Sequence, residues 1–80
     1  MDRKEFDTLH AKCVSAFEAY AVEAEVTAAM LADCTADPLP FQVRLKIALQ
    51  ERIENTAQIA YTATKRLLHE AARLGYAFTE

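Results

Sequence analysis

Residues 33–40 read Asp33-Cys34-Thr35-Ala36-Asp37-Pro38-Leu39-Pro40 and hold both prolines of the 80-residue chain. A residue that precedes proline avoids helical backbone angles, so this segment predicts the end of any helix that enters it. On both sides of it the sequence is rich in alanine and free of β-branched runs, which favours helices over strands. We therefore expect two helices, from about Asp2 to Asp33 and from about Leu39 to Leu74, packed as antiparallel neighbours across a short link.

The same link suggests how the second helix begins. Asp37 is a favourable N-cap residue, and Pro38 would then occupy the first helical position, where its missing N–H costs nothing. Pro40 would still fall within the first turn. Thr35 as the cap of a shorter turn is the alternative.

The single glycine, Gly75, is placed to end the second helix in a left-handed C-cap. Two aromatic residues, Tyr76 and Phe78, follow it. We expect this short tail to dock on the helices, because a free tail rarely carries two aromatic side chains.

Both expected helices carry a seam of apolar and small residues at alternating spacings of four and three, the heptad pattern of long helices that pack at a shallow angle. In the first helix the seam is Phe6, His10, Cys13, Phe17, Tyr20, Ala24, Thr27, Leu31 and Cys34. In the second helix it is Leu45, Leu49, Ile53 (or Arg52), Thr56, Ala60, Ala63, Leu67, Ala71 (or Glu70) and Leu74. Further apolar residues broaden both stripes, and a broad stripe indicates contact with more than one neighbour.

The length of the chain limits the core that it can build. Eighty residues form a single domain, here residues 1–80, and bury only about 60–65% of the surface that the unfolded chain exposes. A lone hairpin whose seam contains many small residues therefore lacks buried apolar area. We expect an all-α fold, an antiparallel two-helix hairpin with long helices, which dimerises into a four-helix bundle.

Charge restricts the partners that we expect. The net charge is −3, so the basic footprint of a nucleic-acid-binding protein is missing, and the bases Arg44, Lys46 and Arg52 are interrupted by Glu51 and Glu54. No apolar stretch is long enough to span a bilayer, and the charged N-terminus does not resemble a signal peptide. We expect no nucleic acid and no membrane as partners, and a cytoplasmic location.

The two halves of the chain differ in charge. Residues 2–33 contain seven acids and three bases, whereas residues 38–80 contain six bases and four acids. Opposite signs suit antiparallel neighbours and help to fix their pairing. Folding about Asp37 sets Glu23 roughly level with Arg52, with Glu25 not far away, and we predict an ion pair between Glu23 and Arg52.

The two cysteines, Cys13 and Cys34, lie three heptads apart in the first expected helix. At about 1.5 Å per residue they would be roughly 31 Å apart, whereas a disulfide needs Cα atoms within about 7 Å. We expect free thiols that pack as small apolar residues, with a bridge between antiparallel copies as the alternative.

The weak candidates for metal ligands are His10, Cys13 and His69, with Asp7 in reach on the first helix. The hairpin would bring His69 to the same end as the other three residues. However, neither histidine has a glutamate three residues before it, as carboxylate-bridged di-iron bundles require. We expect no metal and no other cofactor.

A polar layer is expected in the middle of the bundle, where Tyr20 and Tyr61 point inward. Such layers usually set helix register. The alternative is a small-molecule pocket lined by the residues Tyr20, Thr27, Asn55 and Thr56.

Catalytic patterns are missing from the sequence. Ser15 is the only serine and has no base at a useful spacing, and a single glycine cannot form a phosphate-binding loop. We therefore expect a non-enzymatic module that acts by pairing with itself and with another protein. A bundle that binds a small ligand or a metal is the alternative.

Overall fold

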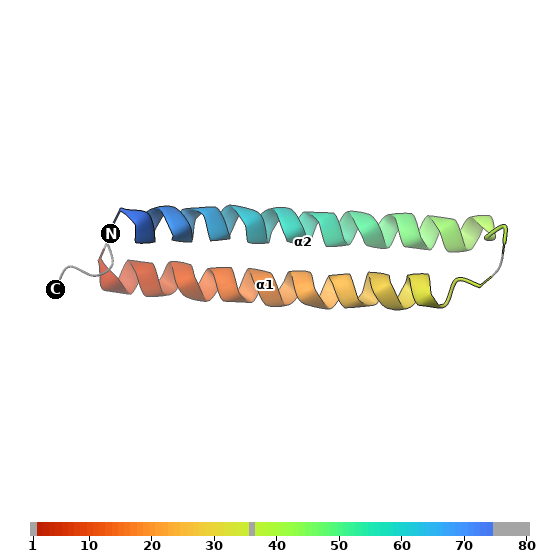
Figure 1. Cartoon of the computed structure of the whole chain (residues 1–80), viewed down its shortest axis with the longest axis horizontal. Coiled ribbons are helices and arrows are strands. Elements are labelled where there is room, and N and C mark those ends of the chain that lie inside the picture. Colours follow the sequence, from red (N-terminus) through yellow and green to blue (C-terminus); the bar gives the residue numbers. More distant parts are fainter. Residues whose placement is uncertain (1, 36, 75–80) are drawn as a thin grey trace.

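The computed structural model of this chain describes residues 2–35 and 37–74 as two long helices lying side by side. Helix α1 spans Arg3–Ala32 and helix α2 spans Phe41–Arg73. The connection between them lies at one end of the molecule, and the start of α1 and the end of α2 lie at the other (Figure 1). The predicted all-helical antiparallel hairpin is therefore confirmed. Gly75, Tyr76 and Phe78 lie outside the described residues.

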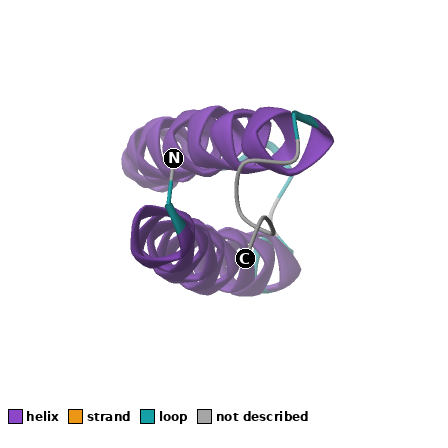
Figure 2. Cartoon of the chain, turned by 90° about the vertical axis from the view of Figure 1, so that its left-hand side faces the viewer, coloured by secondary structure: helices purple, strands orange, loops and turns teal. Residues whose placement is uncertain are grey.

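The hairpin is a thin rod. Its extents are 60 × 14 × 14 Å and its radius of gyration is 17.8 Å, against about 12 Å for a compact chain of this length. Figure 2, which looks along the rod, shows the two helices as a single layer. Within the described residues, each helix therefore has only one helical neighbour.

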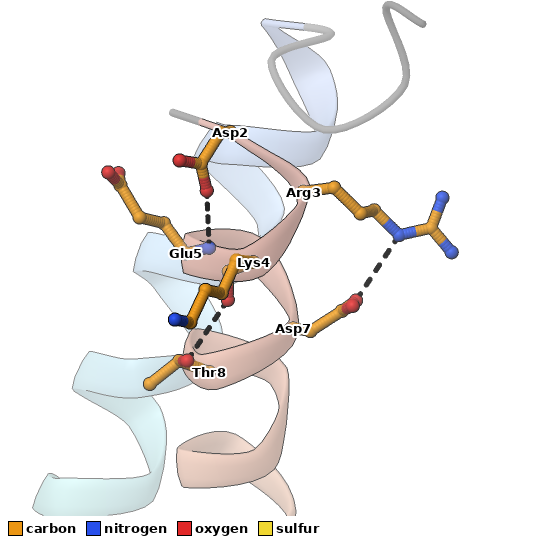
Figure 3. Close-up of polar contacts among 6 residues, drawn as sticks. All are labelled: Asp2, Arg3, Lys4, Glu5, Asp7 and Thr8. Carbon is orange, nitrogen blue, oxygen red and sulfur yellow. Dashed lines mark hydrogen bonds and ion pairs between the residues drawn. The ribbon is translucent and has the colours of Figure 1, made fainter.

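Helix α1 begins close to the predicted start at Asp2. The Asp2 carboxylate accepts a hydrogen bond from the backbone N–H of Glu5 at 2.8 Å, so Asp2 is the N-cap (Figure 3). The Arg3 guanidinium contacts the Asp7 carboxylate one turn later at 3.3 Å, and the Thr8 hydroxyl donates to the Lys4 carbonyl. The cap satisfies a backbone donor that a helix start otherwise leaves unpaired.

Helix α2 begins later than the Asp37 cap predicts, and that part of the prediction is wrong. The N-cap is Pro40, in an extended conformation with φ −57° and ψ 148°, and no side chain caps the helix. Asp37 and Leu39 each precede a proline and are therefore disfavoured in the helical region. The second proline thus delays the helix to Phe41, and Pro38, joined to Asp37 by a cis peptide, lies in the connection. Thr35 also lies in the connection, exposed.

The interface between the helices follows a regular heptad seam. Its positions, which are mostly half-buried, alternate at spacings of four and three along each helix. In α1 they are Phe6, Leu9, Cys13, Ala16, Tyr20, Glu23, Thr27, Met30, and Cys34 just beyond the helix end. In α2 they are Val43, Ile47, Gln50, Glu54, Ala57, Tyr61, Thr64, Leu68 and Ala71.

The seam predicted for α2 is wrong in all but Ala71. The other predicted positions, including the alternatives Arg52 and Glu70, are exposed, and they are Leu45, Leu49, Ile53, Thr56, Ala60, Ala63, Leu67 and Leu74. In α1 the prediction holds except at His10 and Leu31, which are exposed. Phe17 is about half exposed, but its ring meets that of Tyr61 of α2 edge-on at 5.2 Å. The second helix contains two series at heptad spacing. The helices meet through the less apolar one, in which the Tyr61 ring lies 6.1 Å from that of Tyr20.

The packed seam predicts unequal roles for two isoleucines of α2. Ile47 is only 9% exposed at the interface, whereas Ile59 is 71% exposed on the outside. We expect Ile47→Ala to lower the free energy of unfolding by about 2–4 kcal/mol, because it leaves a cavity between the helices. Ile59→Ala should change it by less than about 0.5 kcal/mol. Urea denaturation followed by circular dichroism measures both, and equal effects would contradict the observed seam.

Candidate interaction surface

A shallow groove of about 700 Å³ runs between the helices on one side of the hairpin. Its lining is mainly apolar and comes from Ala19, Val22 and Glu23 of α1 and from Arg52, Ile53, Thr56, Ala57 and Ala60 of α2. Two of the side chains that line it are strongly exposed, Val22 at 58% and Ile53 at 51%. The groove is an open surface and does not enclose a cavity.

The groove is the centre of a longer apolar stripe on both helices, which we call the groove face. Residues three or four apart on a helix share one side, so Val26 continues the α1 wall and Leu49 and Leu67 continue the α2 wall. The groove face comprises Ala19, Val22, Val26, Leu49, Ile53, Thr56, Ala60, Ala63 and Leu67. Six positions of the seam predicted for α2, from Leu49 to Leu67, therefore lie on an exposed face.

The opposite side of the hairpin is less suited to apolar contact. Ala28 and Leu31 of α1 lie there, but α2 contributes Glu51, Glu54 and Asn55 to the same depression. Val14 and Phe17 extend the α1 part of this side, at 42% and 48% exposure. We call this stripe of α1 the outer stripe. Its apolar character ends at α1, whereas the groove face is apolar on both helices.

The hairpin buries little of its side-chain surface. Within residues 2–35 and 37–74, only Cys13, Thr27, Ile47 and Ala71 are buried, and no large side chain is fully enclosed. The chain exposes 6139 Å², whereas a folded monomer of its 8.9 kDa mass typically exposes about 4,800 Å². About 1,300 Å² of surface is therefore in excess of what a compact chain leaves open.

A polar layer lies at the middle of the seam, and besides the two predicted tyrosines it contains Gln50 and Glu23, which the sequence did not predict as members. The Gln50 side-chain amide donates to the Glu23 carbonyl across the interface at 3.2 Å, and the Thr27 hydroxyl donates to the same carbonyl at 3.0 Å. Tyr20 and Tyr61 are half-buried and stack, with an interplanar angle of 9°. Their inward orientation is confirmed, and the cross-helix hydrogen bond fixes which turns of α1 and α2 lie level.

The four residues of the alternative small-molecule pocket do not share one site. Thr27 and Asn55 line a depression on the side opposite the groove, and Tyr20 lies in the seam. Thr56 lies on the groove face. These side chains do not converge on a common ligand position.

The remaining candidate residues are placed as follows. Cys13 is a buried free thiol in the seam, while His10 and His69 are exposed. In the described part of the chain, no three His, Cys, Asp or Glu side chains are grouped to hold a metal ion. Cys34 is free and half-buried, and its thiol donates to the Met30 carbonyl.

The ion pair between Glu23 and Arg52 stays a prediction. Both residues line the groove, so the structure brings them to the same stretch of the surface. The ion pairs at Arg3–Asp7 and Glu70–Arg73 each join two residues of one helix.

Comparison with protein-family models, curated proteins and solved structures finds no significant match to this chain. Neither of the two described helices contains a segment apolar enough to cross a membrane.

The polar layer predicts a measurable role for Gln50. We expect Gln50→Ala to lower the free energy of unfolding by about 1 kcal/mol, because it removes the hydrogen bond to the Glu23 carbonyl. Gln58→Ala is the matched control, since Gln58 is an exposed glutamine of the same helix and should be neutral. Urea denaturation distinguishes them, and a neutral Gln50→Ala variant would show that this bond does not stabilise the pairing.

Proposed function

We propose that this chain is a non-enzymatic assembly module, a helical hairpin that pairs with itself and presents its remaining surface to a protein partner. One observation carries the proposal, namely the groove face, where both helices expose apolar side chains. An apolar stripe that spans two elements of a small protein marks an interaction site, because contact with water is unfavourable there.

The surface area supports this proposal. The excess of about 1,300 Å² is larger than the roughly 800 Å² that each partner contributes to a stable interface of standard size. The shape supports it as well, because a rod of two helices gives each helix a single neighbour. Pairing with a second hairpin gives each helix a second neighbour and encloses the groove face in a four-helix bundle.

The outer stripe is the surface that we assign to a protein partner of another kind. Phe17 and Leu31, each about half exposed, lie on it at helical spacing. Amphipathic helices of partner proteins bind such stripes through apolar anchors at the same spacing. Carboxylates of α2, at Glu51 and Glu54, border the stripe near Leu31 and favour a partner with a basic residue at that end.

Self-association is the measurement that tests this function. We expect sedimentation equilibrium at about 1–100 µM protein to give the mass of a dimer. The melting temperature should rise with protein concentration, because association stabilises only the folded state.

A variant with both Val14→Asp and Ile53→Asp is the matched control. It places a charge on each side of the hairpin, on side chains that are about half exposed. We expect it to sediment as a monomer and to melt independently of concentration. A wild-type chain that remains monomeric over the whole range would overturn the proposed function.

A further inference from the structure

We infer that the groove face binds a second copy of this chain, rotated by half a turn about the long axis of the hairpin, so that α1 of each copy lies over α2 of the other. The inference rests on the proposed self-association and adds the face and the orientation. It predicts an ion pair between Glu25 of one copy and the partner's Arg52.

The dimensions of the groove face suit a second hairpin. From Leu49 to Leu67 the stripe on α2 is about 27 Å long, at about 1.5 Å per residue. On α1, Ala19, Val22 and Val26 match about 10 Å of this length. A second copy offers an equally long stripe that is also apolar on two helices, so each copy buries the other's exposed surface.

Two symmetric arrangements bring the groove faces of two copies together. Rotation about the long axis places α1 over the partner's α2, with the two helices antiparallel. Rotation about an axis across the rod places α1 over the partner's α1 and α2 over the partner's α2. Both arrangements bury the apolar stripes, so charge has to distinguish them.

The charges favour α1 over the partner's α2. Residues 2–33, which include α1, contain seven acids and three bases, whereas residues 38–80, which include α2, contain six bases and four acids. The arrangement that places α1 on the partner's α1 sets the acidic helices against each other. Like charges across an interface are unfavourable, whereas opposite charges favour association.

In this arrangement Glu25 and the partner's Arg52 form a specific contact. Glu23 of α1 and Arg52 of α2 line the same stretch of the groove, and Glu25 lies only about 3 Å further along α1 than Glu23, so Glu25 and Arg52 stand near the same level. Both residues are exposed. Each lies two residues from a seam position, Thr27 in α1 and Glu54 in α2, and therefore on the side of its helix that faces away from the seam, the outer edge.

Within one chain the outer edges of α1 and α2 face away from each other, so Glu25 and Arg52 are separated by the width of both helices. Rotation about the long axis keeps every residue at its level. It brings the outer edge of α1 beside the outer edge of the partner's α2, so that Glu25 lies beside the partner's Arg52. The dimer contains this contact twice.

Substitutions on the two sides of the hairpin test the face. We expect Ile53→Asp, on the groove face, to raise the dimer dissociation constant by at least about a hundredfold, because it buries a charge at two places in each dimer. Val14→Asp, on the outer stripe, should change it by less than about threefold. The reverse result would place the interface on the other side and overturn the inference, while leaving self-association intact.

Charge reversal tests the orientation. We expect Glu25→Arg and Arg52→Glu each to raise the dissociation constant by about tenfold, because two attractive contacts per dimer become repulsive. In an equimolar mixture of the two variants, an acid meets a base at both contacts of the mixed dimer. Sedimentation of the mixture should therefore restore association to nearly the wild-type level.

Glu18→Arg is the matched control for the change in net charge. Glu18 lies on the same outer edge one heptad earlier, near the level of Ile59, so its reversal should change the dissociation constant by less than about threefold. Glu25→Arg also makes the net charge of −3 less negative, which by itself would favour pairing. Weaker pairing of that variant therefore reports the local contact.

Each outcome decides between the two proposals. A wild-type monomer overturns both the proposed function and this inference. A wild-type dimer that is insensitive to both reversals, or a mixture that does not regain affinity, overturns the orientation alone. Weakening by each reversal with recovery in the mixture supports it.

Discussion

This structure depends on one constraint: in a single layer of two helices, each helix is covered by the other on one side only. A chain with 52% hydrophobic residues carries more apolar surface than one such contact can enclose. The outcome is a rod of 60 × 14 × 14 Å in which Cys13, Ile47 and Ala71 are the apolar side chains that count as buried among the described residues. The fold is therefore regular in its backbone but incomplete in its burial of apolar surface.

The seam combines pairing specificity with modest apolar burial. Gln50, Glu54 and Thr64 occupy seam positions in α2, and the Gln50 amide reaches the Glu23 carbonyl across the interface. Polar groups at a helix interface favour one register over its neighbours, because other registers leave those groups unpaired. The more apolar series of α2, through Leu49 and Ile53, is then available to bury area elsewhere.

The sequence was sufficient to predict the two helices and their antiparallel pairing, since the prolines mark one break and heptad spacing continues on both sides. It was not sufficient to identify the packed face of α2, because Ile53 and Ile47 belong to two series with the same spacing. The series of Ile53 is the more apolar one, so apolar content alone predicts that it packs against α1. The series of Ile47 faces α1 instead, because it contains Tyr61 and Gln50, which make the contacts between the helices. Val22 was missed for a similar reason, although its spacing from Ala19 and Val26 marks a second stripe on α1.

The two series of α2 also explain why the inferred dimer is geometrically consistent. In the hairpin, α2 meets an antiparallel α1 along Ile47 and Tyr61, and in the inferred dimer it meets a second antiparallel α1 along Leu49 and Ile53. Both contacts pair a basic helix with an acidic one, at the same levels along the rod. A helix with two heptad series about a quarter-turn apart fits the corner of a four-helix bundle, where each helix packs against two neighbours. The sequence of α2 thus suits the proposed dimer, in which the single chain supplies one of its two neighbours.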